Sequence, residues 1–172
     1  MLALEAVSVA GSVLEQNRRI LIVDDDREGT RLLKILLEKI SHYLVLEEND
    51  AAKAHDSARD FRPDLILLDI MMPQIDGGDI AAQIDADPGL HRTPIIFLTA
   101  VATNAEAKAG ISFQGHPVLA KPINILELIN RIEKICPGKG VTKTKRRSAT
   151  NAVKIVAGIL PVEQSGGDQL AM

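Results

Sequence analysis

Residues 20–26 read ILIVDDD, four aliphatic side chains in a row followed at once by three carboxylates. The same form returns as LILLD at 65–69 and IIFLT at 95–99, and a shorter version, VLAK, occupies 118–121. An unbroken apolar run, in contrast to an alternating one, is typical of a strand that is covered on both faces. The repeated pattern therefore predicts a parallel sheet with helices on both sides.

Stretches with helical spacing or helix-capping residues separate these runs. The second strand is expected at 43–46, and the helices are expected at 27–39, from Asn49 or Asp50 to 60, at 76–85, at 104–109 and at 124–135. Strands and helices thus alternate in five units. We predict an α/β fold with a doubly wound five-stranded parallel sheet.

Composition bounds the class of protein. The chain has 172 residues, of which 46% are hydrophobic, 25% charged and only 2% aromatic, so we expect a globular core built from aliphatic side chains. The single cysteine, Cys136, excludes a disulfide framework. No apolar run approaches the length of a membrane span, and no basic residue precedes Arg18, as one would in a secretory signal. We therefore expect a cytoplasmic protein with no membrane partner.

Charge divides the chain into three parts: an N-terminal extension at 1–17, a domain at 18–136 and a basic, flexible tail at 137–172. The domain carries 14 basic and 19 acidic side chains, whereas the tail carries 6 basic and 2 acidic ones. An acidic domain argues against a nucleic-acid groove, and charge runs such as that of the tail are more often solvated linkers. The tail is also too short for a helix-turn-helix output domain, so nucleic acid is not expected as a partner.

Chemistry-bearing side chains follow the apolar runs. Asp24 and Asp25 follow the first, Asp69 ends the third, Thr99 ends the fourth and Lys121 follows the fifth. Each alone has an ordinary explanation as a turn, cap or solvated residue. In an open parallel sheet, however, the carboxyl ends of the strands meet at one edge. Three neighbouring carboxylates repel one another unless a cation neutralises them, and Mg²⁺ with its preference for oxygen ligands suits such a site.

The segments ILIVDDD, LILLDIMMPQIDG, IIFLTA and LAKP, in this order, resemble the receiver domain of two-component response regulators. The resemblance covers about Arg18 to Cys136. It implies a flavodoxin-like (βα)5 fold with strand order 2-1-3-4-5. It also implies that the chain is a receiver with short tails, which catalyses only its own phosphorylation and dephosphorylation and is not a metabolic enzyme.

The resemblance also assigns roles by motif position. Asp69 resembles the phosphoacceptor, Thr99 the switch hydroxyl and Lys121 the lysine that pairs with the phosphoryl group. Asp24 and Asp25 resemble the acidic pair that binds Mg²⁺ together with Asp69. The backbone carbonyl of Met71 is a further expected metal ligand, and the peptide bond before Pro122 is expected to be cis.

The implied partners are a sensor histidine kinase or phosphotransfer protein as phosphodonor and an unidentified downstream protein target. A phosphorylation-driven conformational switch is expected to carry the signal between them. The sequence departs from the family at Val118, where a Tyr or Phe is usual, and in the segment GISFQGHP at 110–117. Met71 and Val101 are expected to flank the path of an attacking water, and because both are apolar we expect slow loss of the phosphoryl group.

Two other functions remain open at this stage. A haloacid-dehalogenase-like phosphatase could use Asp24, Asp26, Thr99 and Lys121, but it would leave Asp69 without a role. A non-phosphorylated, receiver-like adaptor is favoured only by Val118, since such proteins usually lose one of the acidic or lysine positions that this chain keeps.

Overall fold

The computed structural model describes residues 17–100 and 112–137. The expected helix at 104–109, Val101, the extension at 1–16 and the tail from 138 onward lie outside these residues. The elements are, in chain order, β1 (Arg19–Val23), α1 (Arg27–Ser41), β2 (Leu44–Glu48), η1 (Ala51–Lys53), α2 (Ala54–Phe61), β3 (Leu65–Asp69), α3 (Gly77–Ala86), β4 (Ile95–Thr99), β5 (Ser112–Phe113), β6 (His116–Ala120) and α5 (Ile125–Ile135).

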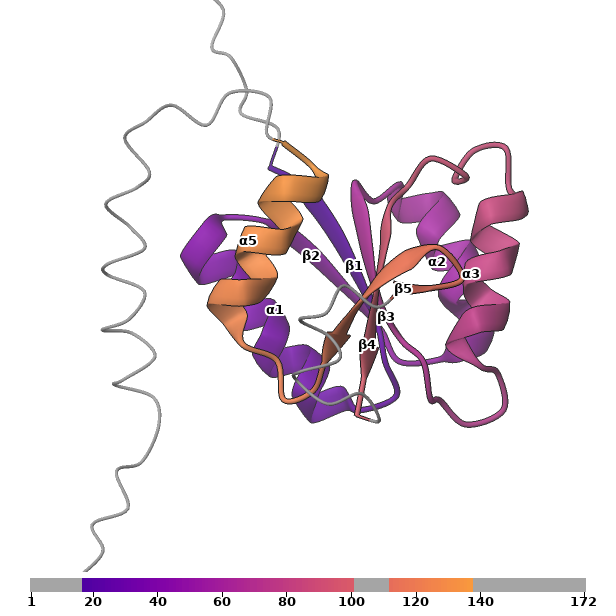
Figure 1. Cartoon of the computed structure of the whole chain (residues 1–172), viewed down its shortest axis with the longest axis horizontal. Coiled ribbons are helices and arrows are strands. Elements are labelled where there is room, and N and C mark those ends of the chain that lie inside the picture. The colour runs from indigo at the N-terminus through magenta and orange to yellow at the C-terminus, as the bar shows by residue number, and fades with distance from the viewer. Residues whose placement is uncertain (1–16, 101–111, 138–172) are drawn as a thin grey trace, which may run out of the picture.

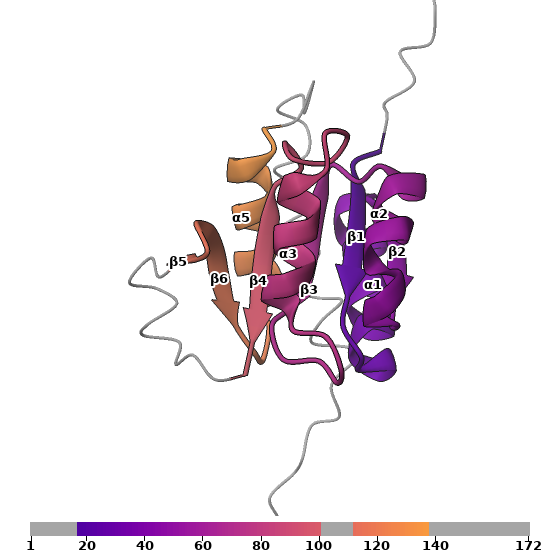
Figure 2. The same cartoon turned by 90° about the vertical axis from the view of Figure 1, so that its right-hand side faces the viewer.

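The strands form one sheet in the order β2-β1-β3-β4-β6-β5. All neighbours from β2 to β6 pair in parallel, and Figure 2 shows these five strands side by side. Because β6 is the fifth parallel strand along the chain, the expected order 2-1-3-4-5 is confirmed. This order places β1, β3, β4 and β6 beside one another, so their carboxyl ends share one edge of the sheet.

A short antiparallel strand extends the five parallel strands that were expected. The sixth strand, β5, has two residues and pairs antiparallel with β6, with Phe113 opposite His116. The loop between them is Gln114-Gly115, and both residues have positive φ, 51° and 87°. Two positive φ values suit the tight turns whose twist matches that of a hairpin. The sequence pattern missed β5 because two residues are too short to show any hydrophobic period.

Helices cover both faces of the sheet, α1 and α5 on one side and α2 and α3 on the other (Figure 1). Strand residues alternate between the two layers. Ile20 and Ile22 pack with the residues of α1 and α5, whereas Leu21 and Val23 pack with those of α2 and α3. All four side chains are fully buried. The unbroken apolar runs are therefore explained by a sheet that is buried on both faces.

Three side chains begin helices close to the carboxyl edge of the sheet. Asp26 caps α1 by accepting from two backbone N–H groups of its first turn, Asp76 caps α3 and Asn124 caps α5. The caps at Asp76 and Asn124 agree with the sequence prediction. The caps lie three to seven residues after the preceding strand ends, and each fixes the end of its connecting loop at this edge.

The opposite edge is held by a partly buried polar network. The Tyr43 hydroxyl donates to Glu133 of α5 at 2.5 Å, and Arg18 pairs with the same carboxylate at 2.7 Å. Arg18 also donates to the backbone carbonyl of Cys136. Burial, followed by the bond to Glu133, raises the pKa of Tyr43 well above its usual range. The end of α5 is thereby tied to the start of β1 and β2.

Within the described part of the chain, no helix is long and apolar enough to cross a bilayer.

Candidate functional site

Three carboxylates meet at the carboxyl edge of the sheet. Asp24 directly follows β1, Asp25 comes next, and Asp69 is the last residue of β3. One carboxylate oxygen from each lies within 4.8 Å of the others. Asp24 is 6% exposed and Asp69 5% exposed, whereas Asp25 is exposed. The structure thus brings together the acidic residues that the sequence singled out, with one of them open to solvent.

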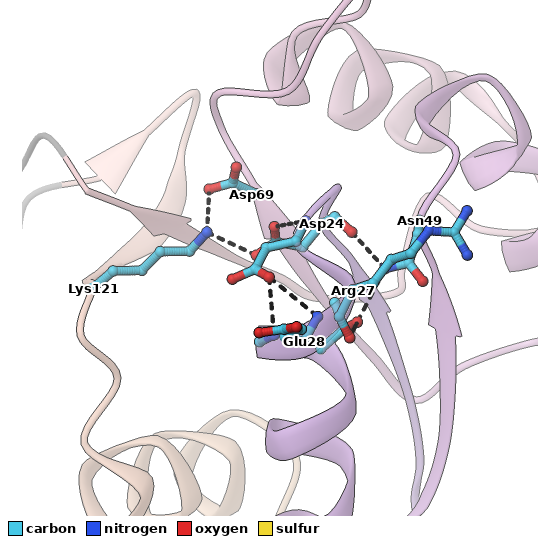
Figure 3. Close-up of polar contacts among 9 residues, drawn as sticks. Asp24, Arg27, Glu28, Asn49, Asp69 and Lys121 are labelled. Carbon is cyan, nitrogen blue, oxygen red and sulfur yellow. Dashed lines mark hydrogen bonds and ion pairs between the residues drawn. The ribbon is translucent and has the colours of Figure 1, made fainter.

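Lys121 joins this cluster from the end of β6. Its ammonium contacts Asp24 Oδ2 at 2.7 Å and Asp69 Oδ1 at 3.0 Å, as Figure 3 shows. The backbone N–H of Lys121 donates to the carbonyl of Thr99 at 2.7 Å, which ties the ends of β6 and β4 together. The Lys121–Pro122 peptide bond is cis, as the resemblance implied. The ammonium is therefore held between Asp69 and the loop of residues 24–26 after β1, which we call the acidic loop.

The pKa values of two residues in the cluster, Asp69 and Lys121, are shifted. Burial raises the pKa of the Asp69 carboxyl, and the nearby charges of Asp24 and Asp25 act in the same direction; the bond from Lys121 offsets this only in part. Burial by itself would lower the pKa of Lys121, but its bonds to Asp24 and Asp69 outweigh that effect and the pKa is raised. Lys121 is therefore firmly charged at neutral pH, and it compensates the repulsion on Asp69 only in part.

Thr99 and Met71, the other two expected site residues, belong to strand ends at the same edge of the sheet. Thr99 ends β4 and is 5% exposed. Asp69 pairs in register with Leu98, so Thr99 is one position further along the neighbouring strand. Met71 lies two residues beyond β3, and its side chain is 64% exposed.

The loop after β3 folds tightly back on Asp69. The Gly77 N–H donates to the Ile70 carbonyl at 2.9 Å. A Cβ added at Gly77 would lie 2.1 Å from the backbone oxygen of Asp69, so any larger residue would displace the loop. In the sequence, Gly77 is only the last residue of the motif LILLDIMMPQIDG, whereas the structure shows that the motif needs a residue without a side chain at this point.

The structure decides between Asn49 and Asp50, the two residues expected as caps of the second helix. Asp50 is the cap, because its side chain accepts from the backbone N–H of Ala52. The Asn49 carboxamide instead donates to the backbone carbonyl of Asp24 at 2.7 Å. The signal available in the sequence was its position, since Asn49 directly follows β2 at the same edge of the sheet.

The donor set fits a hard divalent cation. Three carboxylate oxygens converge, one cationic side chain is shared between two of them, and Asp25 keeps the cluster open to solvent. Mg²⁺ prefers a few carboxylate ligands together with retained waters. Asp24, Asp25 and Asp69 could therefore hold such an ion.

The phosphatase hypothesis does not fit the position of Asp26. Its carboxylate accepts from the N–H groups of Glu28 and Gly29, both at 3.1 Å, and so serves as the cap of α1. It is not part of the acidic cluster found among the described residues. Val118, one of the two departures from the resemblance, is 3% exposed. Val118 pairs in register with Phe97, and the Phe113 ring packs edge to face on Phe97, with the ring centroids 5.1 Å apart.

Comparison with known sequences identifies similar proteins. Residues 20–133 match the family model of the response regulator receiver domain. The transcriptional regulatory protein CpxR of Escherichia coli K12 is 41% identical over 117 residues, which cover 68% of this chain and 48% of CpxR. The DNA-binding response regulator MtrA of Mycobacterium leprae is 33% identical over 115 residues, covering 67% and 49%. The chain thus spans about half the length of these curated relatives.

Solved structures give the same family. A Chloroflexus aurantiacus protein described as a response regulator matches with a TM-score of 0.62 and 28% identity, covering 70% of this chain and 98% of that one. The receiver domain of the Francisella response regulator 1452 matches with a TM-score of 0.59 and 26% identity, covering 69% and 96%. These matches confirm the flavodoxin-like receiver fold.

The names of the sequence relatives bear on the expected partners. CpxR is named as a transcriptional regulator and MtrA as a DNA-binding one. Proteins that contain this kind of domain therefore include regulators that bind DNA. This finding runs against the expectation, drawn from charge and tail length alone, that nucleic acid is not a partner.

Proposed function

This chain belongs to the response regulator receiver domain family of two-component signalling, and on that premise we propose that Asp69 accepts a phosphoryl group. The observation that carries the proposal is the position of the Asp69 carboxylate, buried at the edge of the sheet between an acidic pair and the ammonium of Lys121. The family is not one of metabolic enzymes. The chemistry proposed for this chain is limited to its own phosphorylation and dephosphorylation.

The proposed donor is a phosphohistidine of a sensor histidine kinase or of a phosphotransfer protein. An oxygen of Asp69 attacks the phosphorus while the phosphorus–nitrogen bond breaks, and the released imidazole takes up a proton. The product is an acyl phosphate on Asp69. Since little covalent chemistry is left to other groups, the surrounding side chains act mainly by positioning the reactants and stabilising charge.

Asp24, Asp25 and Asp69, with the backbone carbonyl of Met71, are the proposed ligands of Mg²⁺. When bound, the ion supplies positive charge that lowers the repulsion between the carboxylate and the incoming phosphoryl oxygens. Asp25 is the exposed member of the set, and it leaves the ion accessible to a donor that arrives from solvent. The acidic loop alone would repel such a donor.

Lys121 and Thr99 are proposed to respond to the phosphorylation of Asp69 by binding the new phosphoryl group. Lys121 now bridges Asp24 and Asp69, and a new dianion on Asp69 offers it a stronger partner. Thr99 sits at the end of the neighbouring strand, from where its hydroxyl could donate to the same group. Because the ends of β4 and β6 are linked by the bond from Lys121 N–H to Thr99, both strands would move together. A downstream protein would bind the altered surface.

We also propose that residues 18–136 form the functional unit, with 1–17 as an extension and 137–172 as a basic tail. All the proposed site residues fall inside this unit. The tail composition is that of a linker, with six basic residues and two acidic ones.

The experiment is phosphorylation of the full chain by acetyl phosphate with Mg²⁺, followed by intact-protein mass spectrometry. We expect one phosphoryl adduct on the wild type, none after chelation of the metal, and none on Asp69→Asn. Asp79→Asn is the matched control, since it makes the same change at an exposed position on α3 and should label normally. An undiminished adduct on Asp69→Asn would place the acceptor elsewhere, and an unlabelled wild type would favour the adaptor function.

A further inference from the structure

The ladder between β1 and β2 ends at the acidic loop. The last pair in register is Val23 with Glu48, and the last backbone bond runs from Asp24 N–H to the Glu48 carbonyl at 3.2 Å. The next positions along the register are Asp24 and Asn49. Beyond this point the two strands separate, because β1 is followed by α1 and β2 is followed by η1. The Asp24 carbonyl therefore needs a donor that the neighbouring backbone no longer supplies.

The Asn49 carboxamide supplies that donor. Its nitrogen donates to the Asp24 carbonyl at 2.7 Å and to Thr30 Oγ1 at 3.0 Å (Figure 3 shows Asn49 beside Asp24). Thr30 is 1% exposed, and its hydroxyl donates onward to the Arg27 carbonyl at 3.1 Å. The one amide thus fastens the end of β1 and the first turn of α1 to the end of β2.

The held carbonyl belongs to the peptide unit that joins Asp24 to Asp25. Because a peptide unit is planar, fixing its oxygen fixes the direction in which the chain leaves Asp24. That direction decides where the Asp25 carboxylate lies relative to Asp24. The Asp24 side chain is held separately, by Lys121 at 2.7 Å and by the Asp26 N–H at 3.0 Å. The bond from Asn49 therefore controls the geometry between the two carboxylates.

We propose that Asn49 is a positioning residue of the cation site, one that sets the affinity for Mg²⁺ without contacting the ion. The proposal rests on the proposed function, in that it requires Mg²⁺ to bind Asp24, Asp25 and Asp69. Partners that orient metal ligands typically account for 10–100-fold in metal affinity. We expect an effect near the lower limit, about tenfold, because a water molecule can replace part of the lost bond.

The test is titration of the full chain with MgCl₂ by isothermal calorimetry. Asn49→Ala should raise the Kd for Mg²⁺ about tenfold. It should also speed amide hydrogen exchange of the turn at 24–27 in the metal-free protein. Phosphorylation by acetyl phosphate should be slow at limiting Mg²⁺ and should recover at saturating Mg²⁺, since Asn49 takes no part in the transfer itself.

Two controls separate positioning from loss of stability. Asn130→Ala makes the same chemical change at an exposed position of α5, and Ile132→Val removes one methyl group from the fully buried core of that helix. Both should keep the wild-type Kd. Thr30→Val removes one of the two acceptors of the Asn49 amide while keeping the side-chain shape. It should weaken Mg²⁺ binding in the same direction but less, and it serves as the deciding variant if Asn49→Ala does not fold.

The outcomes are distinct. If the wild type binds Mg²⁺ and neither Asn49→Ala nor Thr30→Val changes the Kd, the positioning role is refuted while the proposed function stands. If Ile132→Val weakens binding as much as Asn49→Ala, the effect is one of general stability and the proposal also fails. If the wild type binds no Mg²⁺, the metal site of the proposed function and the role of Asn49 fall together.

Discussion

Replacing Lys121 by Met keeps most of the side-chain length but removes the cation that two buried carboxylates share. At an effective dielectric constant of about 20, Coulomb's law gives about 5–6 kcal/mol of attraction for each contact of the ammonium, 2.7 Å to Asp24 and 3.0 Å to Asp69. At the same dielectric, each pair of carboxylates at 4.8 Å or closer costs about 3.5 kcal/mol or more. Without Lys121 the repulsion is uncompensated.

Protonation of Asp69 sets an upper limit to the free-energy cost of the repulsion between the carboxylates. The pKa of Asp69 is already raised in the folded protein from its ordinary value of 3.8, and loss of Lys121 would raise it further. Once the repulsion exceeds the free energy of taking up a proton, Asp69 becomes neutral. Between the ordinary value and pH 7 that free energy is about 4 kcal/mol, at 1.36 kcal/mol for each pKa unit. We therefore expect Lys121→Met to lower the free energy of unfolding by about 2–4 kcal/mol at pH 7 without metal.

The sign of the pH dependence follows from linkage. With its carboxyl pKa raised, the folded variant binds more protons than the unfolded chain over the range between 3.8 and the folded pKa. Stability must then fall as the pH rises through that range. The difference between Lys121→Met and the wild type should shrink as the pH is lowered from 7 toward 5, by up to about 1.4 kcal/mol for each pH unit.

Urea denaturation followed by circular dichroism measures this difference at several pH values in the presence of a chelator. Lys134→Met, at an exposed position of α5, is the matched control and should show a small, pH-independent effect. A deficit for Lys121→Met that stays the same from pH 5 to pH 7 would mean that packing of the aliphatic stem, and not charge, accounts for the loss. That result would refute the electrostatic argument.

Three other results are expected. Met71→Asn should speed loss of the phosphoryl group from Asp69, measured by the decay of the phosphorylated mass, because an amide can orient a water that an exposed thioether cannot; an unchanged decay would contradict this. Tyr43→Phe should lower the free energy of unfolding by about 1–2 kcal/mol in a urea titration, since it removes the hydroxyl that donates to Glu133; a neutral effect would show that the bond adds little. Deletion of 138–172 should leave both the unfolding midpoint and the labelling of Asp69 unchanged, and loss of either would show that the tail contributes to the domain.

Much of the site could be predicted because it depends on strand direction. The runs that end at Asp24, Asp69 and Thr99 are unbroken and aliphatic, so they indicate buried parallel strands. Parallel strands necessarily place their carboxyl ends at the same edge, and the polar residues that follow them must gather there. Helix starts at Asp76 and Asn124 were predictable for a similar reason, since a cap acts within a few residues of the chain.

Only the tertiary structure decided the contacts that depend on register and on distant parts of the chain. Asn49 faces Asp24 because the β1–β2 ladder ends at Val23 and Glu48, and a one-residue change of register would separate them. Tyr43 and Glu133 are 90 positions apart in sequence, so no local pattern could join them. The two residues of β5 acquire their strand conformation from pairing with β6. Local sequence determines where a strand or helix begins and ends, whereas these contacts arise only when several elements pack together, and their free energy is a property of that packing.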